Sequence, residues 1–412
     1  MKICIHRGTN EIGGTCIELI SKAGSRILLD MGLPLDFEGK DTRKAMPEVR
    51  IDKTIKGVIV SHGHKDHWGL LEHLPKNIPV FIGKQAKEII NSSAVFVPNV
   101  SKLENTKDIK NKKTFAIDDF LITPYLVDHS GFDAYSFVIE ADGKRVFYSG
   151  DFRAHGRKSK LFSSLISNPP TKIDTLLMEG SSLGRLNKNE TFQTEEELEN
   201  DFVEKFKSSK KMILAMASAQ NIDRVVTLFR ACKRTGRTLI IDPYTALILK
   251  ATGNKSIPQS DWKEIRVYIP HFQRVKIKKD KLFDLILPMK SDRIYKEELV
   301  DSAKKYVMLF RESMIKDIDF MGLTEEIEIL YSMWSGYLKD GNSERLLAWK
   351  EKNNISLEHF HTSGHADIPT LKQLAKALNP TTIIPIHTFE KSKFPELFKN
   401  VEIKEDNEPW EI

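Results

Sequence analysis

The sequence predicts an α/β (α+β) fold in which a second α/β domain is inserted into a loop of the first. In the first half of the chain, and again near its end, there are short runs of Val, Ile, Leu and Phe that are bounded by Gly, Asp or Pro. An ionisable residue stands at or just after the end of each of these runs. Runs of this length and composition are typical of buried strands. From about Thr191, helical and strand-like patterns alternate instead, which indicates a separate small parallel sheet.

Length and composition agree with this organisation. A chain of 412 residues favours two domains, and 40% hydrophobic with 29% charged residues is typical of a soluble globular protein. No apolar run has the length of a membrane span, and the N-terminus lacks a signal-peptide core, so we expect a cytoplasmic protein without a membrane partner. The three cysteines are widely spaced, which excludes a disulfide framework and a CxxC metal site.

The net charge is mildly basic. It is +6, from 63 Lys and Arg against 57 Asp and Glu, which is compatible with a polyanionic partner. Basic residues gather at 110–115, 153–160 and 273–281. Taken singly, each of these clusters is more typical of a solvated face than of a nucleic-acid groove.

Ionisable side chains follow the expected strands at the point where each one ends. The ionisable residues at these strand ends are Asp30, His62, His129, Asp151, Glu179 and His387. Because side chains at the carboxyl ends of strands converge along one rim of a sheet, this pattern predicts a single cleft.

The middle of the chain has its own local signals. Apolar residues at helical spacing follow Thr194, which we expect to be an N-cap. A strand, a helix and another strand come next, and the pattern of strand and ligand returns only near the end. We therefore expect a first domain in two parts, 1–190 and 346–412, interrupted by an inserted domain at 191–345.

The stretch "HGHKDH" at 62–67 has the strongest chemical signal. It places His62, His64, Asp66 and His67 in a turn directly after a strand. Two imidazoles two residues apart can face one metal ion, and the carboxylate and the next histidine can serve a second. Imidazole nitrogen with some carboxylate oxygen is the ligand set of zinc. The alternative is a surface loop that is rich in histidine.

This HxHxDH motif resembles that of the metallo-β-lactamase superfamily, whose fold is an αββα sandwich. Other motifs resemble its RNA-processing branch, the β-CASP nucleases, and ribonuclease J-type enzymes most closely. They occur in the family's order over nearly the whole chain: "GTNEIGGTCIEL", "ILLDMG", "LVDHS", "YSGDFR", "LLMEGS", "HTSGHAD" and "IIPIHTFE". The resemblance implies an αββα domain with an inserted β-CASP domain, in which Arg224 faces the cleft.

The resemblance also implies the ligand sets of two zinc ions, with manganese as the alternative metal. One ion would be held by His62, His64 and His129, the other by Asp66, His67 and His387, with Asp151 between them. Asp30 and Glu179 would orient ligating histidines. For Asp30 a turn aspartate, and for Glu179 a structural salt bridge, are the alternatives.

The "HTSGHAD" segment would complete the catalytic site. In the resembling family it holds a phosphate next to the scissile one. We expect His365 to stabilise the transition state or act as general acid, and Ser363 and Gly364 to bind phosphate. His361 is either a further phosphate contact or a core histidine. Asp66, Asp151, His365 and Glu179 are thus the expected catalytic residues.

The activity implied is a ribonuclease that uses a metal-activated hydroxide and gives 5′-phosphate products, as a 5′-to-3′ exonuclease, an endonuclease or both. Single-stranded RNA is the expected partner. The alternatives are a hydrolase of DNA or of a small ester, and a non-catalytic RNA-binding subunit. We expect no room after His387 for the separate C-terminal domain of ribonuclease J, which leaves assembly into a homo-oligomer open.

Overall fold

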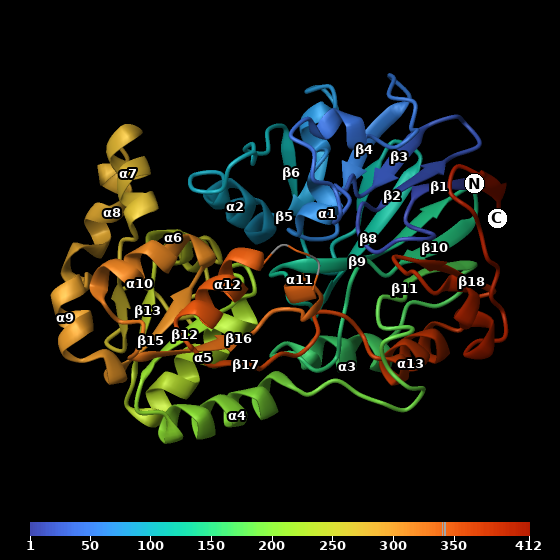
Figure 1. Ribbon diagram of the computed structural model, residues 1–412. Coiled ribbons are helices and arrows are strands. Elements are labelled where there is room, and N and C mark those ends of the chain that lie inside the picture. Colours follow the sequence, from blue (N-terminus) through green and yellow to red (C-terminus); the bar gives the residue numbers. More distant parts are fainter. Residues whose placement is uncertain (340, 342) are drawn as a thin grey trace. The chain divides into compact units, whose positions relative to one another are not determined.

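The computed structural model describes residues 1–339, 341 and 343–412, which form two compact units (Figure 1). The first unit comprises Met1–Asn91, Asn99–Phe192 and Gly364–Ile412, and the second comprises Ser92–Pro98 and Gln193–Ser363. The domain boundaries expected at 190 and 345 stay a prediction, and the second unit as observed continues to Ser363.

The first unit is built on two sheets. One has the strand order β19-β1-β2-β3-β4-β5-β6 and the other β18-β11-β10-β9-β8-β7. The strands of the first sheet are β1 (Lys2–Arg7), β2 (Cys16–Ile20), β3 (Arg26–Leu29), β4 (Ile55–Ile59), β5 (Val80–Gly83), β6 (Thr106–Ile109) and β19 (Trp410–Glu411). Those of the second are β7 (Phe115–Ile117), β8 (Phe120–Val127), β9 (Ala134–Ala141), β10 (Lys144–Tyr148), β11 (Thr175–Glu179) and β18 (Thr382–Ile386).

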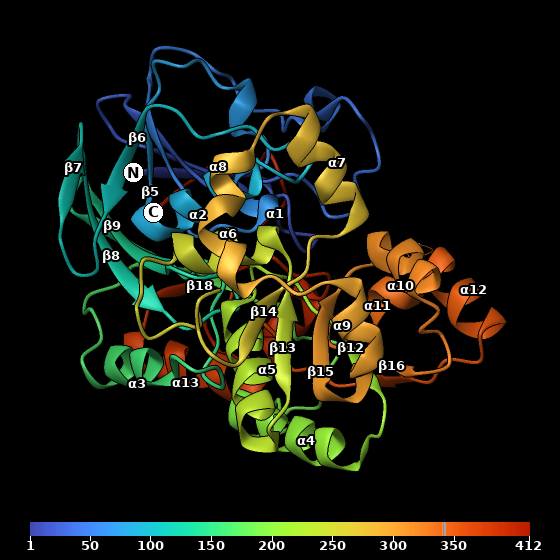
Figure 2. The same ribbon diagram turned by 90° about the vertical axis from the view of Figure 1, so that its left-hand side faces the viewer.

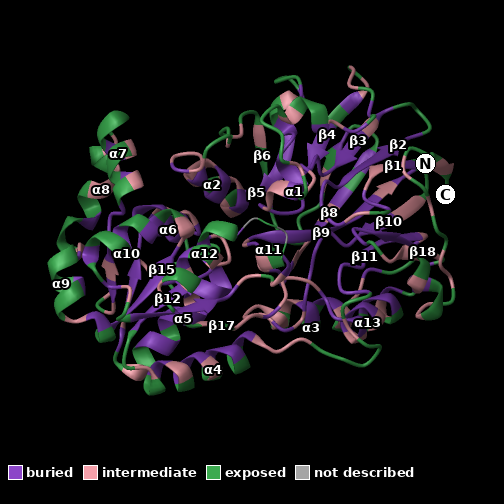
Figure 3. Ribbon diagram, in the orientation of Figure 1, coloured by how far each residue is buried: buried purple, intermediate pink, exposed green. Residues whose placement is uncertain are grey.

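Apolar side chains of the two sheets share one core. Ile17 and Leu29 of the first sheet are fully buried together with Phe137 and Leu177 of the second. Figure 3 shows buried residues, in purple, along strands of both sheets. On the outer faces, α1 (Lys65–Trp68) and α2 (Lys84–Ser93) cover the first sheet, while α3 (Ser159–Ser167) and α13 (Ile368–Leu378) cover the second. The predicted α/β class and the layered αββα order are confirmed.

Strand direction brings the ends of the donor-bearing strands to the same side of each sheet. In the first sheet β3 and β4 are parallel. In the second, β10 is parallel to β11, and β11 is parallel to β18. Strands β8 and β10 both run antiparallel to β9 and therefore share that direction. Residues at the ends of these strands or shortly after them therefore gather at one edge.

The second unit contains a six-stranded parallel sheet of order β14-β13-β15-β12-β16-β17. Its strands are β12 (Met212–Met216), β13 (Thr238–Ile241), β14 (Ile265–Val267), β15 (Tyr306–Phe310), β16 (Ile327–Tyr331) and β17 (Leu357–His359). The helices are α4 (Glu195–Ser208), α5 (Ile222–Thr235), α6 (Pro243–Ala251), α7 (His271–Lys279), α8 (Phe283–Ile286), α9 (Lys296–Asp301), α10 (Ile315–Met321), α11 (Gly336–Lys339) and α12 (Glu344–Lys352).

Helix α4 has Thr194 as its N-cap, as the sequence predicted. The helix packs beside α5 (Figure 2). The Thr194 hydroxyl accepts a hydrogen bond from the backbone N–H of Glu197, whose carboxylate accepts one from the Thr194 N–H. This reciprocal pair satisfies two backbone donors at the helix start. Among the described residues, no helix is both long and apolar enough to cross a membrane.

Candidate metal centre

The turn after β4 carries four of the expected donors. From the end of β4 the chain runs through His62 and His64 into α1, which contains Asp66 and His67. The segment after β3 lies directly against this turn, because a Cβ at Gly32 would be 1.7 Å from the carbonyl oxygen of Asp66. Only glycine allows so close an approach. The backbone of the segment after β3 therefore packs against the backbone of the turn.

The imidazoles of His62, His64 and His129 meet at one point. Nδ1 of His64 lies 3.0 Å from Nε2 of His62 and 3.1 Å from Nε2 of His129. Burial, and then the neighbouring rings, hold the pKa of His62 and His129 well below the usual value. Burial lowers the pKa of His64 to about 4. All three rings are therefore neutral near pH 7, as metal ligands must be.

Hydrogen bonds on the far side of two of these rings fix their orientation. Nδ1 of His129 donates to the carbonyl oxygen of Gly364 at 2.6 Å. Nδ1 of His62 lies 3.1 Å from the hydroxyl of Ser61, which itself donates to Asp30 and so accepts from the ring. Each Nε2 is left without a proton and directed into the site.

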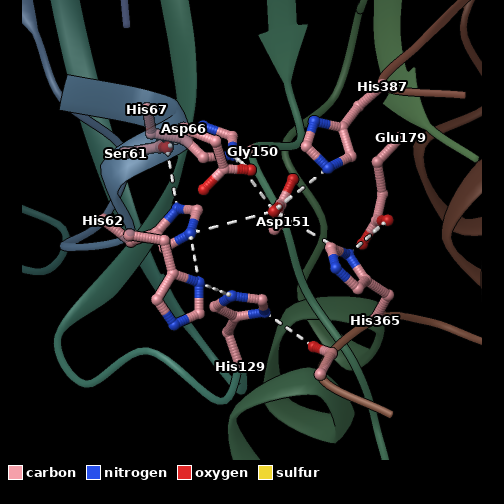
Figure 4. Close-up of polar contacts among 12 residues, drawn as sticks. Ser61, His62, Asp66, His67, His129, Gly150, Asp151, Glu179, His365 and His387 are labelled. Carbon is pink, nitrogen blue, oxygen red and sulfur yellow. Dashed lines mark hydrogen bonds and ion pairs between the residues drawn. The ribbon is translucent and has the colours of Figure 1, made fainter. Parts of the chain in front are cut away.

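A second group forms around Asp151. Candidate ligand atoms of Asp66, His67 and His387 all lie within 4.8 Å of one another. Oδ2 of Asp151 is 3.1 Å from Nε2 of His67, 3.6 Å from Nε2 of His387 and 3.8 Å from Nε2 of His62 (Figure 4). Burial raises the pKa of Asp151, but the imidazoles, His387 first, hold it well below the usual value. Asp151 is therefore an ionised carboxylate next to both groups.

Asp30, at the end of β3, orients His67. Its Oδ2 lies 2.7 Å from Nδ1 of His67 and also accepts a hydrogen bond from the hydroxyl of Tyr148, while its Oδ1 accepts one from the Ser61 N–H. The backbone of Asp30 is left-handed, with a φ of 58°, which the surrounding hydrogen bonds maintain. Nothing in the sequence indicated Ser61 or Tyr148, because neither follows a ligand-like pattern.

His387 is held differently from His67. It follows β18, and its Nδ1 accepts a hydrogen bond from the backbone N–H of Gly13 at 3.2 Å, with the hydroxyl of Thr15 at the same distance. A neutral ring in this arrangement carries its proton on Nε2, which faces Asp151. A cation at Nε2 would need this proton on Nδ1, where the hydroxyl of Thr15 could accept a hydrogen bond from it.

Glu179 and His365 form a pair beside Asp151. Nδ1 of His365 lies 3.0 Å from Oε2 of Glu179 and 3.7 Å from Oδ2 of Asp151. Glu179 also accepts hydrogen bonds from the N–H of Phe152 and the hydroxyl of Ser181, so its position is fixed. Although burial lowers the pKa of His365, Glu179 and then Asp151 raise it above the usual value.

Two of the four residues expected to bind phosphate lie in the second unit. These are His361 and Ser363, whereas Gly364 and His365 belong to the first. Burial, and then Arg224, lower the pKa of His361 to about 3, so this ring is neutral. Gly364 has an observed contact that the sequence did not indicate, the hydrogen bond from His129.

The donor set fits bound metal. Nitrogen and carboxylate oxygen are the ligands that zinc prefers. Nε2 of His67 and Nε2 of His387 are buried, and neither makes a hydrogen bond within the described part of the chain. Both nitrogens face the Asp151 carboxylate, at 3.1 and 3.6 Å, and a cation held by the rings and this carboxylate would account for the missing hydrogen bonds. His365 also forms a group of candidate ligand atoms with Asp151 and His387.

Comparison with known families gives the class of protein. Residues 25–185 match the beta-lactamase superfamily domain, and residues 353–405 match the Zn-dependent metallo-hydrolase RNA specificity domain. The chain thus contains a metallo-β-lactamase domain and this RNA specificity domain, which confirms the resemblance to the superfamily. Together with relatives named ribonuclease J, these matches are consistent with a ribonuclease J-like member of the β-CASP branch.

Individual relatives are distant. An RNase J-like protein of Methanocaldococcus jannaschii is 23% identical over 58% of this chain and 57% of its own length, and ribonuclease J of Helicobacter pylori is 24% identical over 55% and 34%. Transcription termination factor FttA of Methanothermobacter thermautotrophicus is 22% identical over 90% of this chain and 64% of its length. The chain thus covers less than two thirds of each of these relatives.

The fold has a close match among solved structures. A crystal structure of a protein of unknown function from Enterococcus faecalis superimposes with a TM-score of 0.80 and covers 99% of both chains at 20% identity. The likeness extends over the whole chain, so both units of the fold occur together in that protein.

Proposed function

We propose that this protein is a dinuclear zinc ribonuclease that hydrolyses RNA phosphodiester bonds and gives 5′-phosphate products. The observation that carries the proposal is the convergence of two groups of donors on the buried carboxylate of Asp151. One zinc would be held by His62, His64 and His129, and the other by Asp66, His67 and His387, with Asp151 shared between them. Manganese is the alternative metal.

The protein's own residues would orient the metal ligands and offset part of the metal charge. When bound, two divalent cations supply Lewis-acid chemistry that activates water near neutral pH and offsets charge on the phosphorus oxygens. Asp151 stays ionised and neutralises part of the positive charge. Asp30 and Gly364 hold the protons on Nδ1 of His67 and His129, which keeps both rings aimed at the site.

His365 would act on the leaving group. Glu179 accepts a hydrogen bond from Nδ1 of His365 and so fixes the ring, and the raised pKa of His365 favours a second ring proton, on Nε2. As the oxygen of a water molecule bonds to phosphorus, the bond between phosphorus and the 3′-oxygen breaks, and His365 gives its proton to the departing 3′-oxygen. The products are then a 3′-hydroxyl and a 5′-phosphate. We assign His361, Ser363 and Gly364 to the neighbouring phosphate.

RNA is the substrate that the comparisons support. The RNA specificity match at 353–405 spans His361, His365 and His387, and relatives named ribonuclease J match 55% and 81% of this chain. We therefore assign the second unit as the inserted β-CASP domain and single-stranded RNA as the partner. Cytoplasmic location, assembly into an oligomer and the choice between exonuclease and endonuclease stay predictions.

One gel experiment tests the proposal. Metal-loaded protein is incubated with 5′-monophosphorylated RNA, 5′-triphosphorylated RNA and single-stranded DNA of the same sequence, and product ends are determined by phosphatase and ligase treatment. We expect cleavage of RNA with 5′-phosphate ends and intact DNA. Cleavage of DNA or of small esters with intact RNA would favour the other hydrolase. RNA binding without cleavage would favour a binding subunit.

The ionic strength of the binding assay supplies a second readout. If lysine and arginine side chains neutralise several phosphates, RNA affinity should fall steeply with added salt. A flat response would argue against a basic RNA path.

A further inference from the structure

The second unit contains an apolar run that its own core does not bury. Residues 282–287 read "LFDLIL", and none of the five apolar side chains is buried. Phe283 is 53% exposed and Leu287 is 65% exposed. The N–H of Leu287 bonds to the carbonyl oxygen of Phe283, so these two side chains lie one turn apart on the same face of α8. Single exposed apolar side chains are ordinary, but a run of this length outside the core indicates an interaction surface.

The preceding helix, α7, presents a basic face. Its exposed side chains are spaced three and four residues apart, which places them on one side of the helix: Arg274, Val275, Lys278 and Lys279. Residues 271–290 contain six Lys or Arg against two Asp, and Lys276 pairs with Asp280 at 2.9 Å. The segment therefore combines a net positive charge with exposed apolar side chains.

The tip of α8 differs from the other exposed aromatic positions nearby in the sequence. Arg293 lies over the ring of Tyr295 at 4.9 Å, and Lys296 lies over the ring of Phe320 at 4.6 Å. The Phe283 ring has no such cation contact within the part of the chain that the structure describes. Phe283 and Leu287 thus leave apolar surface in water that a partner would cover.

We propose that α7 and α8 dock the protein on a membrane surface that contains anionic phospholipids. Phe283 and Leu287 would enter the boundary between head groups and acyl chains, and the basic face of α7 would lie among the lipid phosphates. Figure 1 shows α7 and α8 at the margin of the second unit, and Figure 3 shows most of their residues as exposed. An apolar tip with flanking cations at such a margin fits a flat anionic surface.

Other occupants match these features less well. RNA would account for the cations but not for an exposed leucine. A second copy of the chain would bring two basic faces together, and an acidic helix of a partner protein would need a groove. Surface docking requires no membrane-spanning helix. It departs from the sequence-based expectation of a protein without a membrane partner, and it does not depend on the ribonuclease activity.

Vesicle sedimentation tests the docking. Full-length, metal-loaded protein is mixed with vesicles of phosphatidylglycerol and phosphatidylcholine in equal amounts, or of phosphatidylcholine alone. We expect sedimentation with the anionic vesicles only, weakened by added salt. Phe283→Ser with Leu287→Ser should weaken it about tenfold or more, whereas Leu121→Ser, at a leucine 51% exposed in the first unit, should not. Unchanged sedimentation of the double variant, or none of the native protein, would overturn the proposal.

Charge reversal tests the basic face. Lys278→Glu with Lys279→Glu should weaken binding to the anionic vesicles about tenfold or more. Lys110→Glu with Lys113→Glu makes the same change at two exposed lysines of the first unit and should not. Circular dichroism confirms that each variant is folded. RNA affinity is measured on the same proteins, and a loss of RNA affinity with unchanged vesicle binding would assign α7 to an RNA path instead.

A fluorescent label tests insertion of the tip. The three native cysteines are buried, so a cysteine introduced by Leu287→Cys or Lys113→Cys can be labelled selectively with a dye that brightens in apolar surroundings. Anionic vesicles should brighten the dye at position 287 and not at position 113. The same response at both positions, or none at 287, would contradict the assignment. So would a native dimer that Phe283→Ser with Leu287→Ser converts to a monomer without vesicles, because the tip would then join two copies.

Discussion

Nδ1 of the His67 imidazole lies 2.7 Å from Oδ2 of Asp30, and both side chains are buried. The same carboxylate accepts hydrogen bonds from the hydroxyl of Tyr148 and from the backbone N–H and hydroxyl of Ser61. Because this carboxylate accepts the hydrogen bond from Nδ1, it keeps the ring proton on that nitrogen. The other ring nitrogen faces Asp151, so the orientation of His67 is set from outside the group of candidate ligands.

Replacing Asp30 by Asn should weaken metal binding by about 10–100-fold, because the amide cannot hold the Nδ1 proton of His67 as firmly. Zinc affinity is measured by competition with a chromophoric chelator. The control is Asp118→Asn, in which an exposed carboxylate that accepts from Ser25 is altered in the same way. Equal zinc affinity in the two variants would mean that Asp30 only shapes the turn.

His64→Ala should lose bound zinc and RNA cleavage together. Nδ1 of His64 is within 3.1 Å of both neighbouring ring nitrogens, so the substitution removes one of the three expected ligands in this group. Asp66→Ala should lower the metal content in the same way. Metal per chain is measured by plasma mass spectrometry after dialysis. His271→Ala, at an exposed histidine of the second unit, should keep full metal content, and full content in His64→Ala would contradict the site.

His365→Ala should retain the metal and lose most of the rate. Loss of a general acid costs about 10²–10⁴-fold, and the effect should fall on kcat rather than on KM. Glu179→Gln should give a smaller loss, because the ring stays in place while its proton is held less firmly. Metal content and kinetics are measured on the same preparations. A fall in bound metal in His365→Ala would identify this ring as a ligand instead.

Much of the candidate site could be predicted because its signals are local. Each donor-bearing strand contains a short apolar run, and an ionisable residue lies at its end or within three residues after it, so Asp30, Asp151 and His387 could be named without any knowledge of pairing. The grouping of the donors could not be predicted from these signals. It depends on the parallel pairing of β11 with β18 and of β3 with β4, which joins segments far apart in the chain.

The residues that orient the site were not predicted, for a related reason. Ser61, Tyr148 and Gly13 act through single hydrogen bonds that exist only when separate segments approach one another. Serine and tyrosine at strand ends are common, and no spacing distinguishes these. For Arg224 the family resemblance implied a position facing the cleft. Its side chain is instead fully buried, and Arg224 belongs to the second unit.

Burial of Arg224 makes a prediction about stability. Its guanidinium lies 3.1 Å from Glu195, whose side chain is 1% exposed, and also donates to the carbonyl oxygen of Ser332. Arg224→Met removes the cation that compensates the buried Glu195 carboxylate, which should lower the free energy of unfolding by about 3–5 kcal/mol. Arg230→Met, on the same helix but 56% exposed, should cost about 0–1 kcal/mol. Urea unfolding measures both, and equal losses would contradict the argument.

His6 should make the stability of the first unit depend on pH. Burial lowers its pKa, but hydrogen bonds with Cys4 and then Glu18 outweigh burial and raise it from 6.5 to about 9. Because the folded state binds this proton more tightly than the unfolded state, the stabilisation is complete below pH 6.5 and is lost as the pH rises through about 9. His6→Gln should therefore be less stable than the native protein below pH 6.5, with the difference vanishing above pH 9. Unfolding midpoints in urea across this range measure the effect, and a difference that stays constant with pH would show that His6 is not protonated in the folded protein.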